Sequence, residues 1–164
     1  AKNPPEGTVF VNLHPRDLQD DELYSTSSPL YPFSRRVVFE ITERAGLEEG
    51  LNIQKLVRKL KDLGYRIAID DLGAGYAGLS YFSLLEPDVV KLDLSLIRNI
   101  DQDSVKQKLV GSIQSLCEDL SIMLIAEGIE EKAEHDAITR LGCQILQGYY
   151  YARPGPAYPQ LTEN

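Results

Sequence analysis

Two adjacent carboxylates follow an apolar run near the middle of the chain. Asp70 and Asp71 come directly after Ile67-Ala68-Ile69 and precede a loop with two glycines, Gly73 and Gly75. Neighbouring strand side chains point to opposite faces, but both can turn toward one site where the strand breaks into a loop. Paired carboxylates repel each other, and a hard cation such as Mg²⁺, which prefers carboxylate oxygens, offsets that charge. Because an isolated pair is more often a turn or helix-cap signal, the remaining polar residues must be considered with it.

Polar side chains stand in or at the end of six apolar segments of the chain, and Asp70 is one of them. They are Asn12, Glu40, Asp70, Lys91, Glu127 and Gln147. In parallel α/β folds the carboxyl ends of the strands converge on one face, where loops build the active site. Any one of these residues has a structural explanation, such as a turn, a snorkelling lysine or a satisfied carboxylate. Six in succession are typical of a (β/α)-barrel enzyme.

The segments that must position these residues alternate between strand and helix patterns. Strands are expected over 9–13, 37–42, 65–69, 89–93, 123–127 and 143–148. Helices are expected over 47–63, 78–85, 105–120 and 131–141, and residues 16–34 as a loop-rich connection with only a brief helical turn. Gly64 and Gly142 are placed to end helices, and Asp101 or Asp103 to cap one. Near-continuous apolar strands between helices predict a parallel sheet.

Composition narrows the class of protein. The 164 residues, of which 43% are hydrophobic, fit one domain with a substantial core. A net charge of −8 disfavours DNA or RNA as a partner, but not a small phosphate ester bound through metal ions. The sequence has no apolar stretch near 18 residues, a polar start without a signal peptide, and no metal-ligand spacing at Cys117 and Cys143. We therefore expect a cytoplasmic protein with buried, reduced thiols and no membrane segment.

Six ordered motifs resemble those of the EAL domain, the bacterial phosphodiesterase domain that hydrolyses cyclic di-GMP to linear pGpG. They are Val11-Asn12-Leu13-His14-Pro15, Phe39-Glu40-Ile41-Thr42-Glu43, Asp70-Asp71-Leu72-Gly73-Ala74-Gly75-Tyr76, Val90-Lys91-Leu92-Asp93, Ala126-Glu127-Gly128-Ile129-Glu130 and Gln147-Gly148-Tyr149. The resemblance covers residues 9–154 of a single domain over 1–164, with 155–164 as a tail. It implies a TIM-like (β/α) barrel. Departures such as Leu72, where the family usually has Phe, and His14, where Ser is common, remove no charged or ligating group.

The same resemblance implies a site with two Mg²⁺ or Mn²⁺ ions that binds cyclic di-GMP. It assigns metal binding to Asn12, Glu40, Asp70 and Asp71. The ions would bind a phosphate oxygen and activate water for in-line attack. Lys91 would orient that water and stabilise developing charge, and Glu127 would be an essential acidic residue, so that Lys91, Glu127 and Asp71 form the expected catalytic set.

A further set of residues is expected to bind substrate or anchor a loop. It comprises Glu43, Gly73, Gly75, Tyr76, Asp93, Glu130 and Gln147. Asp93, two residues after Lys91, could hold that lysine. Glu43 resembles the family glutamate that secures the loop over 73–76, which also takes part in homodimer contacts. Glycine suits a loop that folds closely over ligand and metal.

The Glu-Ala-Leu strand that names the family lies upstream of the strand with Asn12, and no counterpart precedes Val9. We therefore expect six of the eight barrel strands, in a chain that is a fragment or pairs with another chain to cover its open edges. The other strands would supply a metal-binding Glu and a phosphate-contacting Arg. We accordingly expect weak or absent activity from this chain alone.

Two alternatives to the phosphodiesterase stay open. One is a non-catalytic module that binds cyclic di-GMP or a protein partner, although degeneracy usually shows as lost acidic ligands. The other is an unrelated metal-dependent barrel enzyme that abstracts a proton beside a carboxylate. That enzyme would not predict the loop after Asp70 together with Glu43. In each case the sequence leaves room for regulatory domains in the parent protein.

Overall fold

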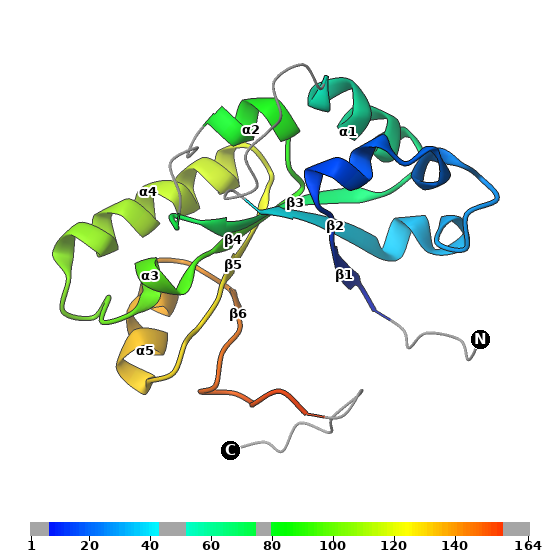
Figure 1. Cartoon of the computed structure of the whole chain (residues 1–164). Coiled ribbons are helices and arrows are strands. Elements are labelled where there is room, and N and C mark those ends of the chain that lie inside the picture. The colour runs from blue at the N-terminus through cyan, green and yellow to red at the C-terminus, as the bar shows by residue number, and fades with distance from the viewer. Residues whose placement is uncertain (1–6, 43–51, 75–79, 156–164) are drawn as a thin grey trace. The chain divides into compact units, whose positions relative to one another are not determined.

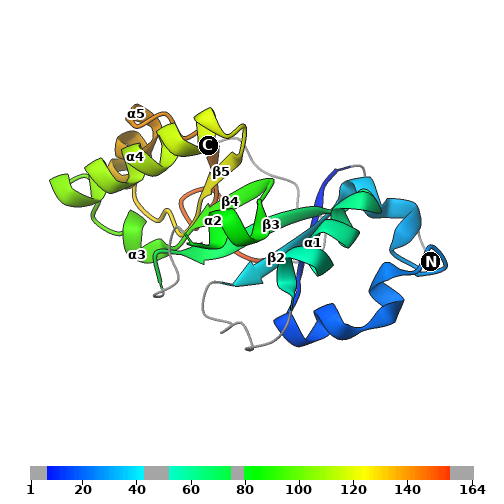
Figure 2. The same cartoon turned by 90° about the horizontal axis from the view of Figure 1, so that it is seen from above.

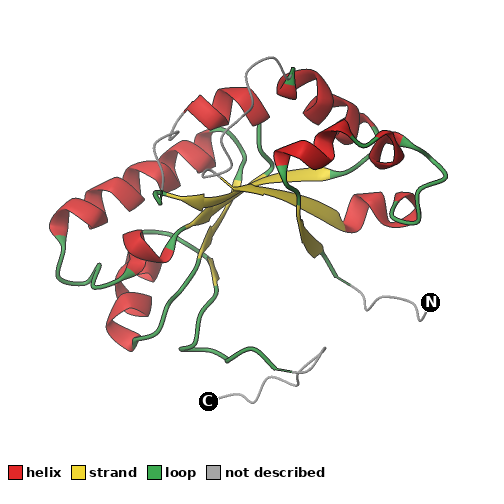
Figure 3. Ribbon diagram, in the orientation of Figure 1, coloured by secondary structure: helices red, strands yellow, loops and turns green. Residues whose placement is uncertain are grey.

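A computed structural model of the chain describes residues 7–42, 52–74 and 80–155. Within these ranges strands and helices alternate along the chain, as Figures 1 and 3 show. The strands are β1 (Val9–Asn12), β2 (Val37–Thr42), β3 (Arg66–Leu72), β4 (Val89–Leu92), β5 (Met123–Ala126) and β6 (Ile145–Leu146). They follow the sheet order β1-β2-β3-β4-β5-β6, so strands adjacent in sequence are adjacent in the sheet. This sequential order is that of a TIM-like (β/α) barrel, which confirms the predicted fold class for six of its strands.

The helices between the strands agree with the sequence pattern except in two places. They are α1 (Ile53–Asp62), α2 (Ser80–Leu85), α3 (Leu94–Ile97), α4 (Ser104–Asp119) and α5 (Lys132–Arg140). Short α3 was not expected. The connection over 16–34 holds 3₁₀ helices η1 (Pro15–Gln19), η2 (Asp21–Tyr24) and η3 (Tyr31–Arg36), so the expectation of only a brief helical turn was wrong. Each is four to six residues long, too short to give a periodic apolar pattern.

The chain divides within β4 into two compact units, Ala1–Lys91 and Leu92–Asn164. In the first unit β1 pairs with β2 and β2 with β3, all parallel, with Phe39, Ile41 and Ile67 fully buried. Helices α1 and α2 lie against β3 (Figure 2). The buried face of α1 is Ile53, Val57 and Leu60, the spacing of an amphipathic helix.

The ends of α1 follow the predicted capping chemistry. The Asn52 side chain accepts a hydrogen bond from the Lys55 N–H at the first turn. At the other end Gly64 has φ of 94°, a left-handed conformation that glycine adopts without strain, and its N–H donates to the Lys61 carbonyl. Gly64 therefore ends the helix, as predicted.

In the second unit β5 and β6 pair in parallel, and α4 and α5 supply the buried apolar faces. Asp103 caps α4, which decides between the two caps that the sequence allowed. Strand β6 has two residues rather than the six expected over 143–148. Beyond it the Gln147 N–H still donates to the Ala126 carbonyl, so the backbone stays bonded after the regular strand ends. None of the described helices is long and apolar enough to cross a membrane.

Candidate active site

Three neighbouring strands of the first unit bring two carboxylates and one ammonium group together. Lys91 Nζ of β4 lies 2.6 Å from Glu40 Oε1 of β2 and 2.9 Å from Asp70 Oδ1 of β3. The side chains of Lys91, Glu40 and Asp70 are 11%, 8% and 15% exposed. Charges this well buried are costly unless they are paired, and here the lysine is shared between two acids. The cluster carries a net charge of −1.

The register of the strands explains why these residues meet. Asn12, the last residue of β1, pairs with Glu40 of β2, and the Leu13 N–H donates to the Glu40 carbonyl. On β3 the residue opposite Glu40 is Ala68, and Asp70 lies two positions further along. Since strand residues two apart share a face, Asp70 is on the same face as Ala68 and two residues nearer the carboxyl end. Asn12, Glu40 and Asp70 therefore line the carboxyl ends of adjacent strands.

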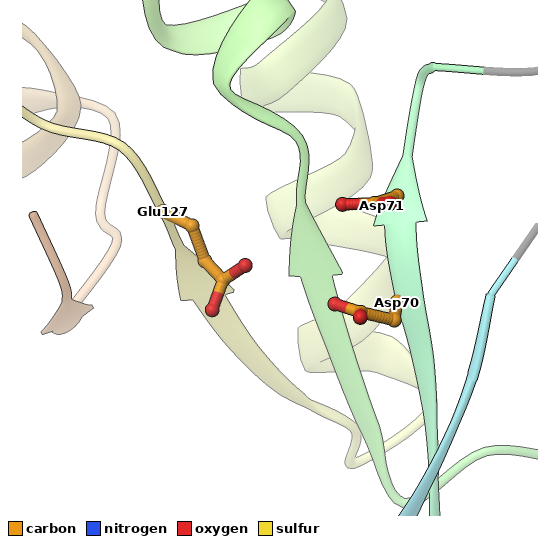
Figure 4. Close-up of side chains that lie close together, drawn as sticks. All are labelled: Asp70, Asp71 and Glu127. Atoms are coloured by element: carbon orange, nitrogen blue, oxygen red, sulfur yellow. The ribbon is translucent and has the colours of Figure 1, made fainter. Parts of the chain in front are cut away.

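Asp71 breaks the alternation of β3. The strand runs to Leu72 rather than ending at Ile69, yet the φ of Asp71 is 55°, a left-handed conformation that Asp tolerates better than most residues. Figure 4 shows Asp70 and Asp71 leaving β3 toward the same side, and their carboxylates have oxygens within 4.8 Å of each other. The Ala74 N–H then donates to the Asp71 carbonyl and closes a turn. Both carboxylates can thus serve one site.

This donor set fits a hard divalent cation. Carboxylate and amide oxygens are the ligands that such cations prefer, and Glu40, Asp70, Asp71 and Asn12 supply both kinds. The 2.6 and 2.9 Å contacts show that Glu40 and Asp70 already share one positive partner, Lys91. A cation bound to these oxygens would replace part of that pairing.

Of the other predicted site residues that the structure describes, Gly73 lies in the first unit and four lie in the second unit. Glu127 follows β5 (Figure 4), and its N–H donates to the Leu92 carbonyl over 3.3 Å. Gln147 follows β6 and is exposed. The carboxylate of Asp93 accepts the Ser95 N–H over 2.9 Å and so caps α3, while Glu130 lies 2.9 Å from the guanidinium of Arg98.

Three predicted residues lie outside the described residues: Glu43, Gly75 and Tyr76. Of the glycines in the loop after Asp71, Gly73 is described and has φ of 104°. That value requires a residue without a Cβ, or a strained one, so glycine suits this position of the loop.

Sequence reasoning missed a buried carboxylate in the second unit, Glu134. This side chain is 1% exposed and accepts backbone hydrogen bonds from the segment after Glu127. The signal that could have found it is the spacing of Glu131 and Glu134, since an acceptor three residues after a helix cap is typical of a capping box.

The description of the matching family model is "EAL domain", and it matches residues 1–154. The chain belongs to the EAL domain family. The match extends eight residues further toward the N-terminus than the resemblance expected from the motifs.

Named relatives of this EAL domain include two bacterial proteins. It is 34% identical over 121 residues to the bifunctional diguanylate cyclase/cyclic di-GMP phosphodiesterase MucR of Pseudomonas aeruginosa, covering 74% of this chain and 18% of MucR. It is 34% identical over 128 residues to the cyclic di-GMP phosphodiesterase PdeF of Escherichia coli, covering 78% of this chain and 17% of PdeF. The chain thus spans under a fifth of the length of these relatives.

Solved structures agree with this fold. Klebsiella pneumoniae BlrP1 in a manganese and cyclic di-GMP complex matches with a TM-score of 0.81 and 34% identity, covering 90% of this chain and 39% of that one. A standalone EAL protein from Vibrio cholerae in its cyclic di-GMP-bound form matches with a TM-score of 0.78 and 34% identity, covering 90% and 65%.

Proposed function

We propose that this EAL domain hydrolyses cyclic di-GMP to linear pGpG. The observation that carries the proposal is the cluster of Glu40, Asp70 and Lys91 at the carboxyl ends of adjacent strands, with Asp71 beside Asp70. Relatives at 34% identity are named as cyclic di-GMP phosphodiesterases, which agrees with this chemistry.

Two divalent cations, Mg²⁺ or Mn²⁺, are part of this proposal. Asn12, Glu40 and Asp70 would hold one, and Asp71 would help hold the second. When bound, such ions supply Lewis-acid chemistry, since they polarise a phosphoryl oxygen and make water a better nucleophile. The substrate carries negative charge, so bare carboxylates would repel it, and the BlrP1 complex contains manganese with the same nucleotide.

The chain's own residues would then orient the attacking water and stabilise the charge that develops. Lys91, whose ammonium lies within 3 Å of two carboxylates, would orient the attacking water and stabilise charge that develops on the phosphate. Glu127 would act as the essential acidic residue. Asp93, Glu130 and Gln147 would bind substrate or anchor a loop. Glu43 and the loop with Gly73, Gly75 and Tyr76 would secure the same site.

The test compares the 164-residue chain with a form extended at its N-terminus. Each is incubated with cyclic di-GMP and Mg²⁺ or Mn²⁺, and linear pGpG is followed by chromatography. We expect turnover by the extended form that Asp70→Asn or Lys91→Ala abolishes, and weak or no turnover by the 164-residue chain. The matched control is Lys55→Ala, which removes an exposed lysine of α1 from the same unit. If the extended form binds the nucleotide and never cleaves it, the domain is a binding module instead.

A bacterial cytoplasmic location is part of this proposal, since Cys117 and Cys143 are both free and buried, which fits a reducing compartment. A homodimer and regulatory partner domains stay predictions.

A further inference from the structure

One carboxylate of the second unit is buried without belonging to the proposed metal ligands. Glu134, in the first turn of α5, is 1% exposed. Its Oε2 accepts the N–H groups of Glu130 and Glu131 over 3.0 and 3.2 Å, and its Oε1 accepts the N–H of Asn99 over 3.1 Å. The guanidinium of Arg98 lies 3.5 Å from the same Oε1. One side chain therefore satisfies three backbone donors from two separate segments.

The segment that Glu134 holds is the one that begins at Glu127. At its start the Glu127 N–H donates to the Leu92 carbonyl, and the Ile129 N–H donates to the Gln147 carbonyl. At its end the backbone N–H groups of Glu130 and Glu131 both donate to the carboxylate of Glu134. The segment 127–131 is thus fixed at both ends, and Glu134 supplies the fixation on the side of α5.

The energetics favour a carboxylate at this position over an apolar residue. Burial alone would raise the pKa of Glu134, but the hydrogen bonds from Glu130, Asn99 and Glu131, together with Arg98, lower it below its usual value. The acid is therefore charged at neutral pH and accepts charge-assisted hydrogen bonds, which are stronger than neutral ones. Without it these three part-buried hydrogen bonds would be lost, and the N–H groups of Asn99, Glu130 and Glu131 would lack their acceptor.

We propose that Glu134 is a positioning residue, which holds the segment 127–131 by its backbone N–H groups and thereby keeps the carboxylate of Glu127 in its working place. The inference rests on the proposed function, because it assigns Glu127 to phosphodiester hydrolysis. The guanidinium of Arg98 stabilises this arrangement, since it forms ion pairs with both Glu134 and Glu130.

Three variants separate positioning from simple helix capping. Glu134→Met keeps the length of the side chain and removes both acceptor oxygens. Glu134→Gln keeps one oxygen, which can still accept the N–H groups of Glu130 and Glu131. The matched control is Glu118→Met, the same change at an exposed position of α4.

The variants are made in the form of the chain that gives turnover, and kcat, KM and the exchange of backbone amide hydrogens are measured. We expect Glu134→Met to lower kcat by on the order of 10- to 100-fold with KM within about twofold, since a small misplacement of a catalytic group costs that much. Amide exchange at Glu130, Glu131 and Asn99 should become faster in the same variant. Glu134→Gln should restore kcat to within about threefold of the wild type, and Glu118→Met should leave kcat unchanged.

Several outcomes would overturn the inference. One is a kcat of Glu134→Met within about twofold of the wild type while amide exchange is faster, since the segment would then be loosened without consequence for the chemistry. Another is an equal loss in Glu134→Gln and Glu134→Met, because the hydrogen-bond acceptor would then not be what matters. If Glu134→Met does not fold, Glu134→Gln decides. A kcat lowered 10-fold or more with unchanged amide exchange at Glu130 and Glu131, or faster exchange there with unchanged kcat, would then overturn the inference. If the wild type binds cyclic di-GMP and never cleaves it, the proposed function fails, whatever the role of Glu134. Unchanged amide exchange at Glu130 and Glu131 in Glu134→Met would show that Glu134 does not hold the segment 127–131, whatever the function.

Discussion

At the scale of single residues, Lys91 has the most closely defined surroundings in the proposed site. Its ammonium lies 2.6 Å from Glu40 and 2.9 Å from Asp70, so it occupies oxygens that a cation would also use. The lysine therefore opposes cation binding electrostatically while it supplies the positive charge that the reaction needs. Removing the ammonium should therefore strengthen cation binding and slow the reaction, so one substitution tests both effects.

We predict that Lys91→Met binds Mn²⁺ more tightly and turns over substrate more slowly. Removing one positive charge next to two buried carboxylates should raise the affinity for the cation by about tenfold, since like charges this close interact strongly. Turnover should fall by about 100-fold or more, because a preorganised positive group at the reacting phosphate is lost. Isothermal titration with Mn²⁺ and a product assay measure the two quantities, with Lys55→Met as the control. Weaker Mn²⁺ binding by the variant would contradict this account.

A second residue-scale prediction concerns the backbone of Asp71. Because its φ is 55°, Asp71→Asn should keep the fold and lose affinity for the cation, since Asn tolerates this conformation and lacks the charge. Asp71→Val should in addition lower the free energy of unfolding by about 1–3 kcal/mol, the usual cost of such strain. Urea unfolding of both variants gives the comparison. Equal stability of the Val and Asn variants would show that the strain is not present.

At the scale of elements, the close packing of the segment after β6 against the segment after β5 can be tested through Gly148. A Cβ at this position would overlap the backbone of Ile129, whose carbonyl accepts the Tyr150 N–H. Gly148→Ala should therefore lower the free energy of unfolding by about 1–3 kcal/mol, as overpacking generally does.

The control is Gly111→Ala in α4, where the nearest atom to the new Cβ is Leu141 Cδ2 at 3.7 Å. That change should raise stability by about 0.5–1 kcal/mol, because alanine suits a helix interior better than glycine. Thermal or urea unfolding reports both. A neutral Gly148→Ala would mean that the two segments are not in contact in solution.

The elements also show what the sequence can predict. Apolar runs predicted all six described strands, since these depend on residues near in sequence. The capping pattern predicted Gly64 and left Asp101 and Asp103 as alternatives, of which Asp103 is the cap. The strand-end position of Glu40, Asp70 and Lys91 was predictable as well. The pairing of Lys91 with both Glu40 and Asp70 was not predictable, because it depends on the register between three strands. Likewise Glu134 could be suspected as a cap, but not as the acceptor for Asn99, which is 35 residues away.

At the scale of the whole molecule, two buried thiols make stability depend on pH at the alkaline end. Cys117 and Cys143 are 1% and 2% exposed. Burial, together with the neighbouring Cys143, raises the pKa of Cys117 from 9.0 to about 11. Burial, together with Glu118, raises the pKa of Cys143 by the same amount. Both thiols are therefore protonated at neutral pH and poorly nucleophilic.

The sign of the effect follows from proton binding in the two states. Well below pH 9 both states hold the thiol protons, so the thiols leave stability unaffected. As the pH rises through 9 toward about 11, the unfolded chain releases these protons first and is favoured. At pH 10 each thiol should cost about 1.4 kcal/mol, or about 3 kcal/mol for the pair. A variant with Cys117→Ala and Cys143→Ala should lose that much less stability than the wild type between pH 8 and pH 10. Urea unfolding at both pH values tests this, because tyrosine and lysine titration and the cavities left by alanine cancel in the double difference. An equal loss in both proteins would show that the thiols are not buried in the folded chain.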